Sequence, residues 1–263
     1  MGELSGRVAA ITGGTRGIGR AIAEAFLRDG ASVVINGRDA AKGERAISEI
    51  HDSLAPGDRV RFVQGDACVL DDCERLVAET VEHYGRIDIL VNNAGGSAQN
   101  APVAQLTDWA LDNALKLNLW STFWCSRAAL AHMIPQQWGR IINISSLEGK
   151  VGKPGVAIYV TAKHAVNGLT KSLAHEVGTL GITVNALCPG AIETDMMKEE
   201  GTKAAASMGM EYQDLLDWFA QESAIKRLNE VEDVALVASL LASEAGAGIT
   251  GSLISIDGGS APY

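Results

Sequence analysis

The sequence has little of several features that define large classes of proteins. No stretch approaches the roughly 20 consecutive apolar residues that a membrane-spanning helix needs. Aromatic residues make up only 5%, and the four cysteines form no Cys-x-x-Cys pair. The five histidines are scattered, without the spacing of a zinc site. These absences argue against a transmembrane segment, a disulfide framework and a bound metal.

The chain also lacks an excess of positive charge. Lysine and arginine number 22 against 32 aspartates and glutamates, so the formal net charge is −10. This balance argues against nucleic acid or a membrane surface as a partner, and a polyanionic ligand would have to be held by local groups. The beginning of the chain has neither the basic start nor the apolar core of a signal peptide, so we expect a cytoplasmic protein.

Short apolar runs alternate with longer amphipathic stretches along the whole chain. The runs expected to be strands are Val8–Thr12, Ser32–Asn36, Val60–Gln64, Ile87–Asn92, Arg140–Ser145, Ile182–Cys188 and Leu253–Asp257. The stretches expected to be helices are Gly17–Asp29, Asp39–Ser53, Asp71–Tyr84, Asp108–Met133, Val156–Val177 and Glu230–Ser243. Such alternation predicts βαβ units with right-handed crossovers. We therefore expect one α/β domain over residues 1–263, a Rossmann-type doubly wound parallel sheet of about seven strands.

One segment interrupts this alternation. Between Asp195 and Leu228 helical patterns follow one another without a strand, and they are rich in methionine and aromatic residues. An ordinary packed pair of helices would show the same apolar stripe. However, the segment follows the carboxyl end of the sixth expected strand, where open α/β sheets bind ligands. We therefore expect residues 195–228 to form a small substrate lobe that acts as a lid.

A glycine-rich turn, Thr12-Gly13-Gly14-Thr15-Arg16-Gly17-Ile18-Gly19, joins the first expected strand to the first helix. Such a turn lets the backbone approach a pyrophosphate and directs helix N–H groups at it. The glycine spacing departs from the usual Gly-x-Gly-x-x-Gly fingerprint of dinucleotide-binding folds. Its place between a strand and a helix nevertheless predicts a dinucleotide site.

The end of the second expected strand bears on which dinucleotide binds. NAD-binding folds commonly place a carboxylate there to hold the ribose 2′-hydroxyl. This strand instead ends in Asn36-Gly37-Arg38, and Arg38 could accept a 2′-phosphate, with Arg16 approaching from the glycine turn. Both arginines could also be ordinary solvated surface residues. The pattern favours NADP over NAD, and Asp39 is interpreted as a helix N-cap.

Tyr159 and Lys163 are four residues apart on an expected helix, so their side chains share one face. A nearby ammonium lowers the pKa of a phenol, which can then exchange a proton with an alcohol or ketone oxygen. Ser146 lies thirteen residues before Tyr159, at the end of an expected strand, where its hydroxyl can point into the same crevice.

With these motifs in this order, the chain resembles the single-domain branch of the short-chain dehydrogenase/reductase family over nearly its whole length. The motifs that carry the resemblance are the Thr12–Gly19 turn, Asp66, Asn92-Asn93-Ala94-Gly95, Asn118, Ser146, Tyr159 with Lys163, and Pro189-Gly190 followed by Thr194.

The resemblance implies a role for each motif. Tyr159 would be the acid/base and Ser146 would hydrogen-bond the substrate oxygen, while Lys163 would bind the nicotinamide ribose and lower the pKa of the tyrosine. Asn118 would help hold a water that links Lys163 to solvent. Besides Tyr159 and Lys163, the implied cofactor-binding residues are Gly13, Thr15, Arg16, Gly17, Ile18, Gly19, Arg38, Asp66, Ala67, Asn92, Ala94, Gly95, Pro189, Gly190, Ile192 and Thr194. The family also implies a homotetramer built partly on the helices expected at 108–133 and 156–177.

The substrate is less constrained by the sequence. The chain resembles 3-oxoacyl reductases and ketoreductases, which makes NADP-dependent reduction of a ketone the first expectation. It also resembles the NAD-dependent 3-hydroxybutyrate dehydrogenase branch, but Glu148 and Val156 stand where that branch carries basic groups. Glu148 could contact a cationic or hydroxyl-rich substrate, or be an exposed loop residue. A non-catalytic NADP-binding scaffold is the alternative from another class.

Overall fold

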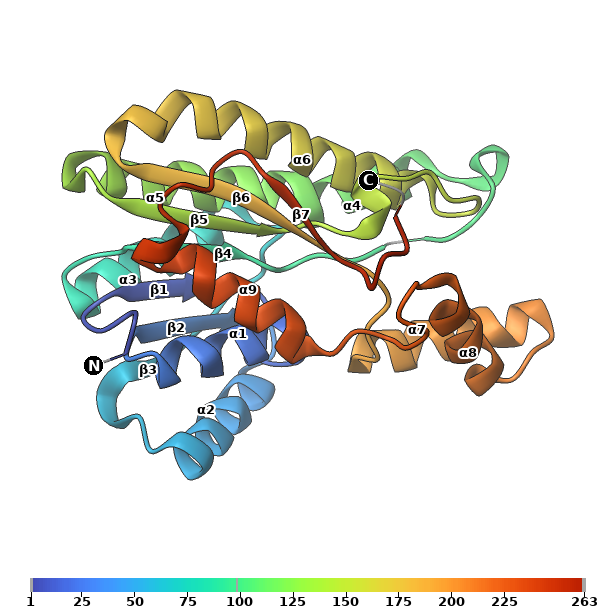
Figure 1. Ribbon diagram of the computed structural model, residues 1–263, viewed down its shortest axis with the longest axis horizontal. Helices are drawn as coiled ribbons and strands as arrows, with labels where there is room; N and C mark the ends of the chain where they lie inside the picture. Colours follow the sequence, from blue (N-terminus) through green and yellow to red (C-terminus); the bar gives the residue numbers. More distant parts are fainter. Residues whose placement is uncertain (1, 98, 262–263) are drawn as a thin grey trace.

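The computed structural model describes residues 2–97 and 99–261, and within them one parallel sheet has seven strands in the order β3-β2-β1-β4-β5-β6-β7 (Figure 1). The strands are β1 (Val8–Ile11), β2 (Ser32–Gly37), β3 (Val60–Gln64), β4 (Ile89–Asn92), β5 (Gly139–Ile144), β6 (Ile182–Pro189) and β7 (Leu253–Ile256). The order reverses between β1 and β4, where the chain crosses from one half of the sheet to the other. The predicted doubly wound Rossmann-type fold is confirmed.

Helices cover both faces of the sheet. One face carries α1 (Gly17–Arg28), α2 (Ala40–Leu54) and α9 (Val231–Ala242). The other carries α3 (Leu70–Tyr84), α5 (Ser121–Gln136) and α6 (Ala157–Val177), and α4 (Asp108–Leu115) packs against the start of α6. Short 3-10 turns lie at Gly57–Arg59, Val103–Gln105, Leu147–Gly149, Gly178–Leu180 and Glu244–Gly246.

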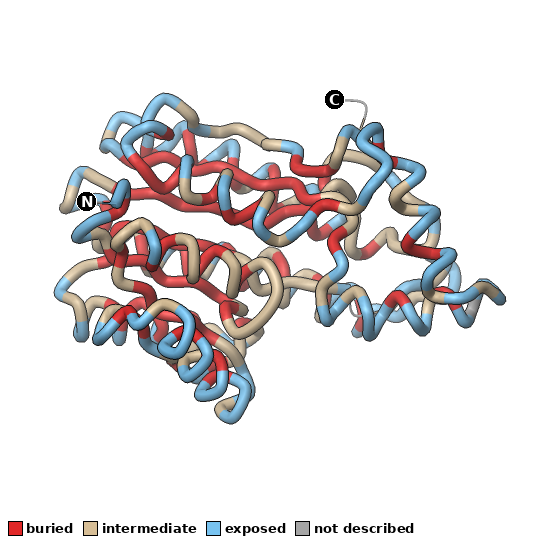
Figure 2. The backbone as a smooth tube through the Cα atoms, turned by 60° about the horizontal axis from the view of Figure 1, so that its bottom comes forward, coloured by how far each residue is buried: buried red, intermediate tan, exposed pale blue. Residues whose placement is uncertain are grey.

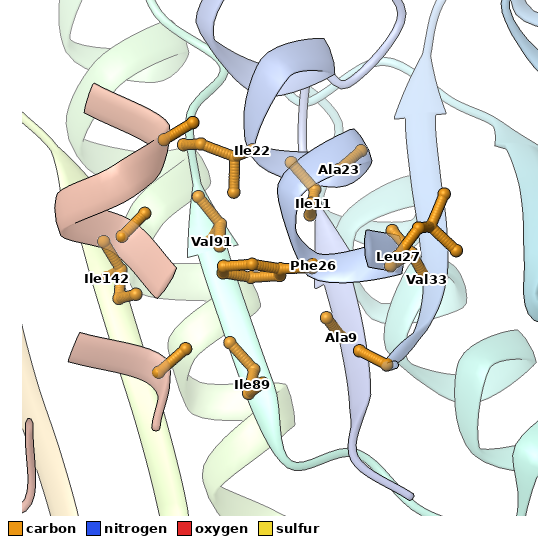
Figure 3. Packing of buried hydrophobic residues seen from close by; sticks show 14 of the residues in the cluster. Ala9, Ile11, Ile22, Ala23, Phe26, Leu27, Val33, Ile89, Val91 and Ile142 are labelled. Carbon is orange, nitrogen blue, oxygen red and sulfur yellow. The ribbon is translucent and has the colours of Figure 1, made fainter. Parts of the chain in front are cut away.

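A separate apolar core fills each side of the sheet. On the first side, the ring of Phe26 is fully buried among residues of α1, β1 and β4, including Ile22, Val91 and Ile89 (Figure 3). Every residue of β1, β4, β5 and β6 is buried, as expected for parallel strands that are covered on both faces. Figure 2 shows this burial as a continuous red band through the strands.

The helix expected over Asp108–Met133 is present and runs without interruption to Gln136, but it is not α-helical throughout. It consists of α4 and α5 joined by a π-helical turn at Lys116–Trp120. Such turns recur at functional sites, and this one contains Asn118, one of the predicted site residues. Asn118 is the buried residue of this turn.

The expected substrate lobe consists of α7 (Asp195–Met208) and α8 (Tyr212–Glu222). The lobe projects past the carboxyl ends of the strands at one end of the molecule (Figure 1). Its surface is largely exposed (Figure 2). Over the described ranges, 2–97 and 99–261, no helix combines the length and the apolar character needed to cross a bilayer.

Candidate active site

Three of the predicted catalytic residues meet where β5 ends and α6 begins. Ser146 follows β5 and is 7% exposed, while Tyr159 and Lys163 lie in the first two turns of α6. The Ser146 side chain lies close enough to the Tyr159 hydroxyl to lower the pKa of the tyrosine as a hydrogen-bond partner. The Lys163 Nζ lies 5.6 Å from the centre of the Tyr159 ring and donates to the Ile144 carbonyl oxygen at 2.8 Å. The structure therefore brings these three side chains together.

Helix α6 packs closely against the loop that follows β5. Asn167 Nδ2 donates to the Gly149 carbonyl oxygen at 2.8 Å. A Cβ atom at Gly149 would lie 2.6 Å from Ser145 Oγ and 2.7 Å from Asn167 Nδ2, so only glycine fits between helix and loop. This contact sets how far the side chains of α6 stand from Ser146.

Glu148 is the direct neighbour of Ser146. The Ser146 Oγ donates to Glu148 Oε2 at 2.5 Å, and the Glu148 backbone N–H donates back to Ser146 Oγ at 3.3 Å. The Glu148 side chain is half-buried, so the reading of it as an exposed loop residue is wrong. The sequence placed Glu148 near the reaction centre but carried no signal that it would bond to the serine itself.

The Tyr159 hydroxyl is strongly biased toward its protonated form. Burial raises the pKa of Tyr159, and the negative charge of Glu148 raises it further, whereas the hydrogen bond with Ser146 lowers it. The expected lowering of this pKa by Lys163 is therefore wrong, because desolvation and the charge of Glu148 dominate and Lys163 is not among the causes of the shift. Near neutral pH, Tyr159 is a proton donor.

Burial acts in the opposite direction on the Lys163 ammonium. Desolvation lowers the pKa of Lys163 to about 8, although Cys188 and Glu148 both favour the charged form. Unfolding returns the amine to its ordinary pKa of 10.5. Between these two values the unfolded chain binds more protons than the folded one, so the Lys163 contribution to stability rises with pH.

We therefore expect Lys163→Met to remove a pH-dependent gain in stability. The free energy of unfolding of the parent, relative to the variant, should rise between pH 8 and pH 9.5, with a slope of at most about 1.4 kcal/mol per pH unit. Urea unfolding at pH 7.5, 8.5 and 9.5 measures the slope. Lys171→Met, on an exposed position of the same helix, is the control. A parent-to-variant difference independent of pH would contradict the expectation.

Asn118 is held by its own side-chain hydrogen bonds in the π-helical turn. Its Nδ2 donates to the carbonyl oxygens of Gly96 and Ala114, both at 2.8 Å, and its Oδ1 accepts from the Gly96 N–H at 3.1 Å. A Cβ at Gly95 would lie 2.8 Å from Asn118 Oδ1 and 3.0 Å from Lys163 Nζ. The Asn118 and Lys163 side chains thus converge on Gly95, at the edge of the group formed by Ser146 and Tyr159.

The glycine turn has the geometry that a pyrophosphate needs. Gly13 and Gly17 have φ angles of +62° and +56°, which residues with a Cβ rarely adopt. Helix α1 begins at Gly17, and no side chain hydrogen-bonds its first N–H groups. A cofactor phosphate would therefore find uncapped donors and a backbone without side chains, so these residues fit the implied dinucleotide. Ile18 packs partly buried on the core beneath the turn.

Two residues outside the predicted set hold this turn in place. Asn93 Nδ2 donates to the carbonyl oxygens of Thr12 and Gly13, at 3.0 and 2.9 Å. Thr12 Oγ1 accepts from the N–H groups of Asn93 and Ala94, at 3.0 and 2.9 Å. Gly19 faces the Asn93 amide with no room for a Cβ. Both residues stood inside recognised motifs, but only the fold shows that they bond to each other.

The residues predicted to bind a 2′-phosphate lie near the carboxyl end of β2. Arg38 is 76% exposed, with Nη1 4.0 Å from Asp66 Oδ2. Thr15 packs against Gly37 so closely that a Cβ atom on Gly37 would lie 2.8 Å from Thr15 Cγ2. Arg16 forms an ion pair with Glu199 of α7 at 3.1 Å. This ion pair joins the glycine turn to the lobe.

The surroundings of these groups fit the expectations in part. The Asp39 carboxylate accepts from the Lys42 N–H at 3.1 Å, which confirms Asp39 as an N-cap. Ala67 is buried directly after Asp66. The buried Asn92 side chain donates instead to Ser126 and Asn143, at 3.1 and 2.8 Å. It therefore joins β4 to α5 and β5, as expected for a residue that stabilises the central strand.

The last predicted segment runs from the end of β6 to the lobe. Pro189 ends β6, and Gly190 lies against Asp257, where a Cβ would come 2.9 Å from the Asp257 Cα. Ile192 is buried, and Thr194 caps α7 by accepting from the Met197 N–H at 3.2 Å. The Thr194 Cγ2 lies 3.5 Å from the position of a Gly17 Cβ. The segment therefore passes beside the glycine turn.

The chain belongs to the short-chain dehydrogenase/reductase family. The sequence profile described as short chain dehydrogenase matches residues 7–205. Among the described residues, no cluster of three or more His, Cys, Asp or Glu is placed to hold a metal ion.

Relatives in this family cover the whole chain but differ in substrate. The D-beta-hydroxybutyrate dehydrogenase of Rhizobium meliloti is 37% identical over 96% of this chain and 98% of its own length. The 3-oxoacyl-(acyl-carrier-protein) reductase of Synechocystis sp. is 36% identical over 98% of each chain. The crystal structure of an actinorhodin polyketide ketoreductase variant with NADPH superposes with a TM-score of 0.93 and 31% identity, over 100% of both chains. The chain is therefore an oxidoreductase of hydroxyl or keto groups.

Proposed function

We propose that the chain is an NADP(H)-dependent ketoreductase that interconverts a ketone and a secondary alcohol, with Tyr159 as the acid/base. The observation that carries this proposal is the meeting of Ser146, Tyr159 and Lys163 at the end of β5. Two hydroxyl groups that lie beside each other there can both donate to one substrate oxygen. Bound nicotinamide would supply or accept the hydride.

The residues of this chain provide the proton and the orientation. Ser146 donates to the carbonyl oxygen and stabilises the charge that develops on it. Tyr159, protonated because its pKa is raised, gives its proton to the same oxygen during reduction. Lys163, 3% exposed and mostly protonated at neutral pH, would hold the ribose hydroxyls of the cofactor. Asn118, on the far side of Gly95, would take the implied water that links Lys163 to solvent.

The cofactor site lies along the carboxyl ends of β1, β2 and β4. The glycine turn fits the pyrophosphate, and Arg38 with Arg16 would hold a 2′-phosphate. The related ketoreductase structure contains NADPH, which supports the same choice here. The Arg16–Glu199 ion pair would have to open for Arg16 to contribute. Being exposed, that pair contributes little stability, so its loss costs little.

The substrate is a ketone or a 3-oxoacyl compound in this proposal. The 3-hydroxybutyrate alternative is supported by the Rhizobium meliloti relative, but Glu148 and Val156 offer no positive charge to a substrate carboxylate. Initial rates of NADPH oxidation with a panel of ketones test the activity. Oxidation above the background rate supports a ketoreductase, whereas NADPH binding without turnover of any ketone supports the non-catalytic scaffold.

The lobe supplies the outer wall of the substrate pocket in this proposal. Lys153, from the loop that follows Ser146, has its Nζ 5.2 Å from the Trp218 ring and 4.6 Å from the Phe219 ring of α8. Cation–π contacts of this kind contribute about 0.5–1 kcal/mol at exposed sites. The lobe is thus tied to the active-site loop by weak contacts, which suit a lid that opens and closes.

The proposed homotetramer uses apolar surface on α5. Phe123 and Ile134 are exposed on this helix at 37% and 39%, and Trp120 precedes them at 46%. We expect sedimentation to show a tetramer for the parent at micromolar concentration and smaller species for Phe123→Glu, because a buried charge would disrupt the contact. Val103→Glu, at an exposed apolar position outside this helix, is the control. A parent that sediments as a monomer would refute the assembly.

A further inference from the structure

The Glu148 carboxylate accepts a hydrogen bond from the Ser146 hydroxyl, the same group that the proposed function assigns to the substrate oxygen. Ser146 Oγ donates its hydrogen to Glu148 Oε2 at 2.5 Å. A hydroxyl has one hydrogen to donate, so Ser146 cannot bond to Glu148 and to a carbonyl oxygen at the same time. Binding of any ketone to Ser146 therefore deprives Glu148 of this donor.

The neighbouring cations are directed to other partners. Lys150 Nζ donates to Ser255 Oγ at 2.8 Å. Lys153 Nζ lies over the rings of Trp218 and Phe219. Lys163 Nζ is buried and donates to the Ile144 carbonyl oxygen at 2.8 Å. A half-buried carboxylate that loses its donor is destabilised unless another donor replaces it.

The ligand itself is the nearest source of a new donor. The carbonyl oxygen would bind where Ser146 Oγ and Tyr159 Oη meet, and Glu148 Oε2 lies within one hydrogen bond of Ser146 Oγ. The substituent on the carbon next to the carbonyl is then the part of the substrate closest to the carboxylate. We propose that Glu148 selects ketones that carry a hydrogen-bond donor, a hydroxyl or a protonated amine, on that carbon, and rejects those that carry a carboxylate there.

This inference rests on the proposed function and explains the charge of the pocket. The electrostatic effect of Glu148 reaches the reaction centre, since it raises the pKa of both Tyr159 and Lys163. The same charge repels a substrate carboxylate and opposes the negative charge that develops on the carbonyl oxygen. A substrate donor bonded to Glu148 offsets both effects, and an apolar substituent offsets neither.

Four ketones of the form CH3–CO–CH2–X test the proposal with one skeleton. They are butanone (X = CH3), hydroxyacetone (X = OH), aminoacetone (X = NH3⁺) and acetoacetate (X = CO2⁻). For the parent we expect kcat/KM to be at least about tenfold higher with hydroxyacetone or aminoacetone than with butanone, and lowest with acetoacetate, because hydrogen bonds to charged groups are the strong ones. Comparison of the two donor ketones shows whether the hydroxyl or the ammonium is preferred.

Glu148→Gln removes the charge and keeps the shape. We expect it to reduce the preference for the donor ketones over butanone to about threefold or less, and to raise kcat/KM with acetoacetate at least about tenfold. Glu176→Gln makes the same change in net charge at an exposed position near the end of α6 and should leave all ratios unchanged. Equal ratios in the parent and in Glu148→Gln would overturn the inference.

A binding measurement separates this inference from the proposed function. In the Tyr159→Phe background with NADPH present, ligand-observed NMR gives dissociation constants without turnover. We expect hydroxyacetone to bind at least about fivefold more weakly when Glu148→Gln is added, because the charged acceptor is lost. If the parent turns over no ketone of the wider panel, the proposed activity fails while this binding test of Glu148 remains. Unchanged hydroxyacetone binding would overturn the role of Glu148.

Discussion

Tyr159→Phe is expected to lower turnover by at least about 100-fold while the protein stays folded and binds NADPH as before. The variant removes only the phenolic oxygen, which lies beside Ser146 and in the proposed mechanism carries the proton that reduction consumes. The ring remains, so the packing of α6 beside Lys163 is preserved. Because removal of a buried hydroxyl also removes its desolvation, we expect little change in the free energy of unfolding.

Steady-state rates with the best ketone, together with NADPH fluorescence titration, measure both parts of this prediction. Tyr212→Phe is the matched control, because Tyr212 is a lobe tyrosine whose hydroxyl bonds to Glu193 at 3.4 Å, away from Ser146. It should retain parental turnover. A Tyr159→Phe enzyme that works at the parental rate would show that another group supplies the proton.

Arg38→Asp is expected to weaken the binding of NADPH by at least about tenfold and to shift the cofactor preference toward NADH. NADPH differs from NADH only in the 2′-phosphate, so the discrimination must come from groups at the carboxyl end of β2. The substitution removes an attractive charge and adds a repulsive one beside Asp66, which already lies 4.0 Å from Arg38. Charge-assisted hydrogen bonds contribute about 1.5–3 kcal/mol each, and less at an exposed position such as this one.

Initial rates with both cofactors at matched subsaturating concentrations measure the preference. The effect should shrink at high salt, because the phosphate–arginine pair is exposed to solvent. Arg28→Asp is the control for the change in net charge. Arg28 is paired with Glu24 at the end of α1 that lies away from the glycine turn. A parent enzyme that prefers NADH would refute the role given to Arg38.

Most of the fold could be predicted from local patterns. A buried parallel strand is apolar at nearly every residue, and β3 has the predicted bounds Val60–Gln64. The π-helical turn between α4 and α5 could not be predicted. It is accompanied by hydrogen bonds between Asn118 and Gly96, which lies 22 residues earlier in the chain. Amphipathic periodicity does not register such a contact.

The candidate site divides in the same way. Ser146, Tyr159 and Lys163 follow from motif spacing, because strand ends and one helix face bring them together. The partners of charged groups do not follow from motif spacing, since they depend on the direction of each side chain. Arg16 bonds to Glu199, 183 residues away, and burial reverses the expected pKa shift of Tyr159. Spacing therefore locates the reacting groups, and only the packed structure gives their protonation.

The close contact at Gly149 has a consequence for how new specificities arise in this chain. The Asn167 side chain bonds to the Gly149 carbonyl oxygen and holds α6 against the loop that follows Ser146, at a point where no Cβ would fit. The proposed lid residues lie on the exposed lobe, apart from this contact. If the lobe does wall the substrate pocket as proposed, mutations there could change the substrate range without moving α6 relative to Ser146, so the reacting geometry and the substrate range could evolve separately.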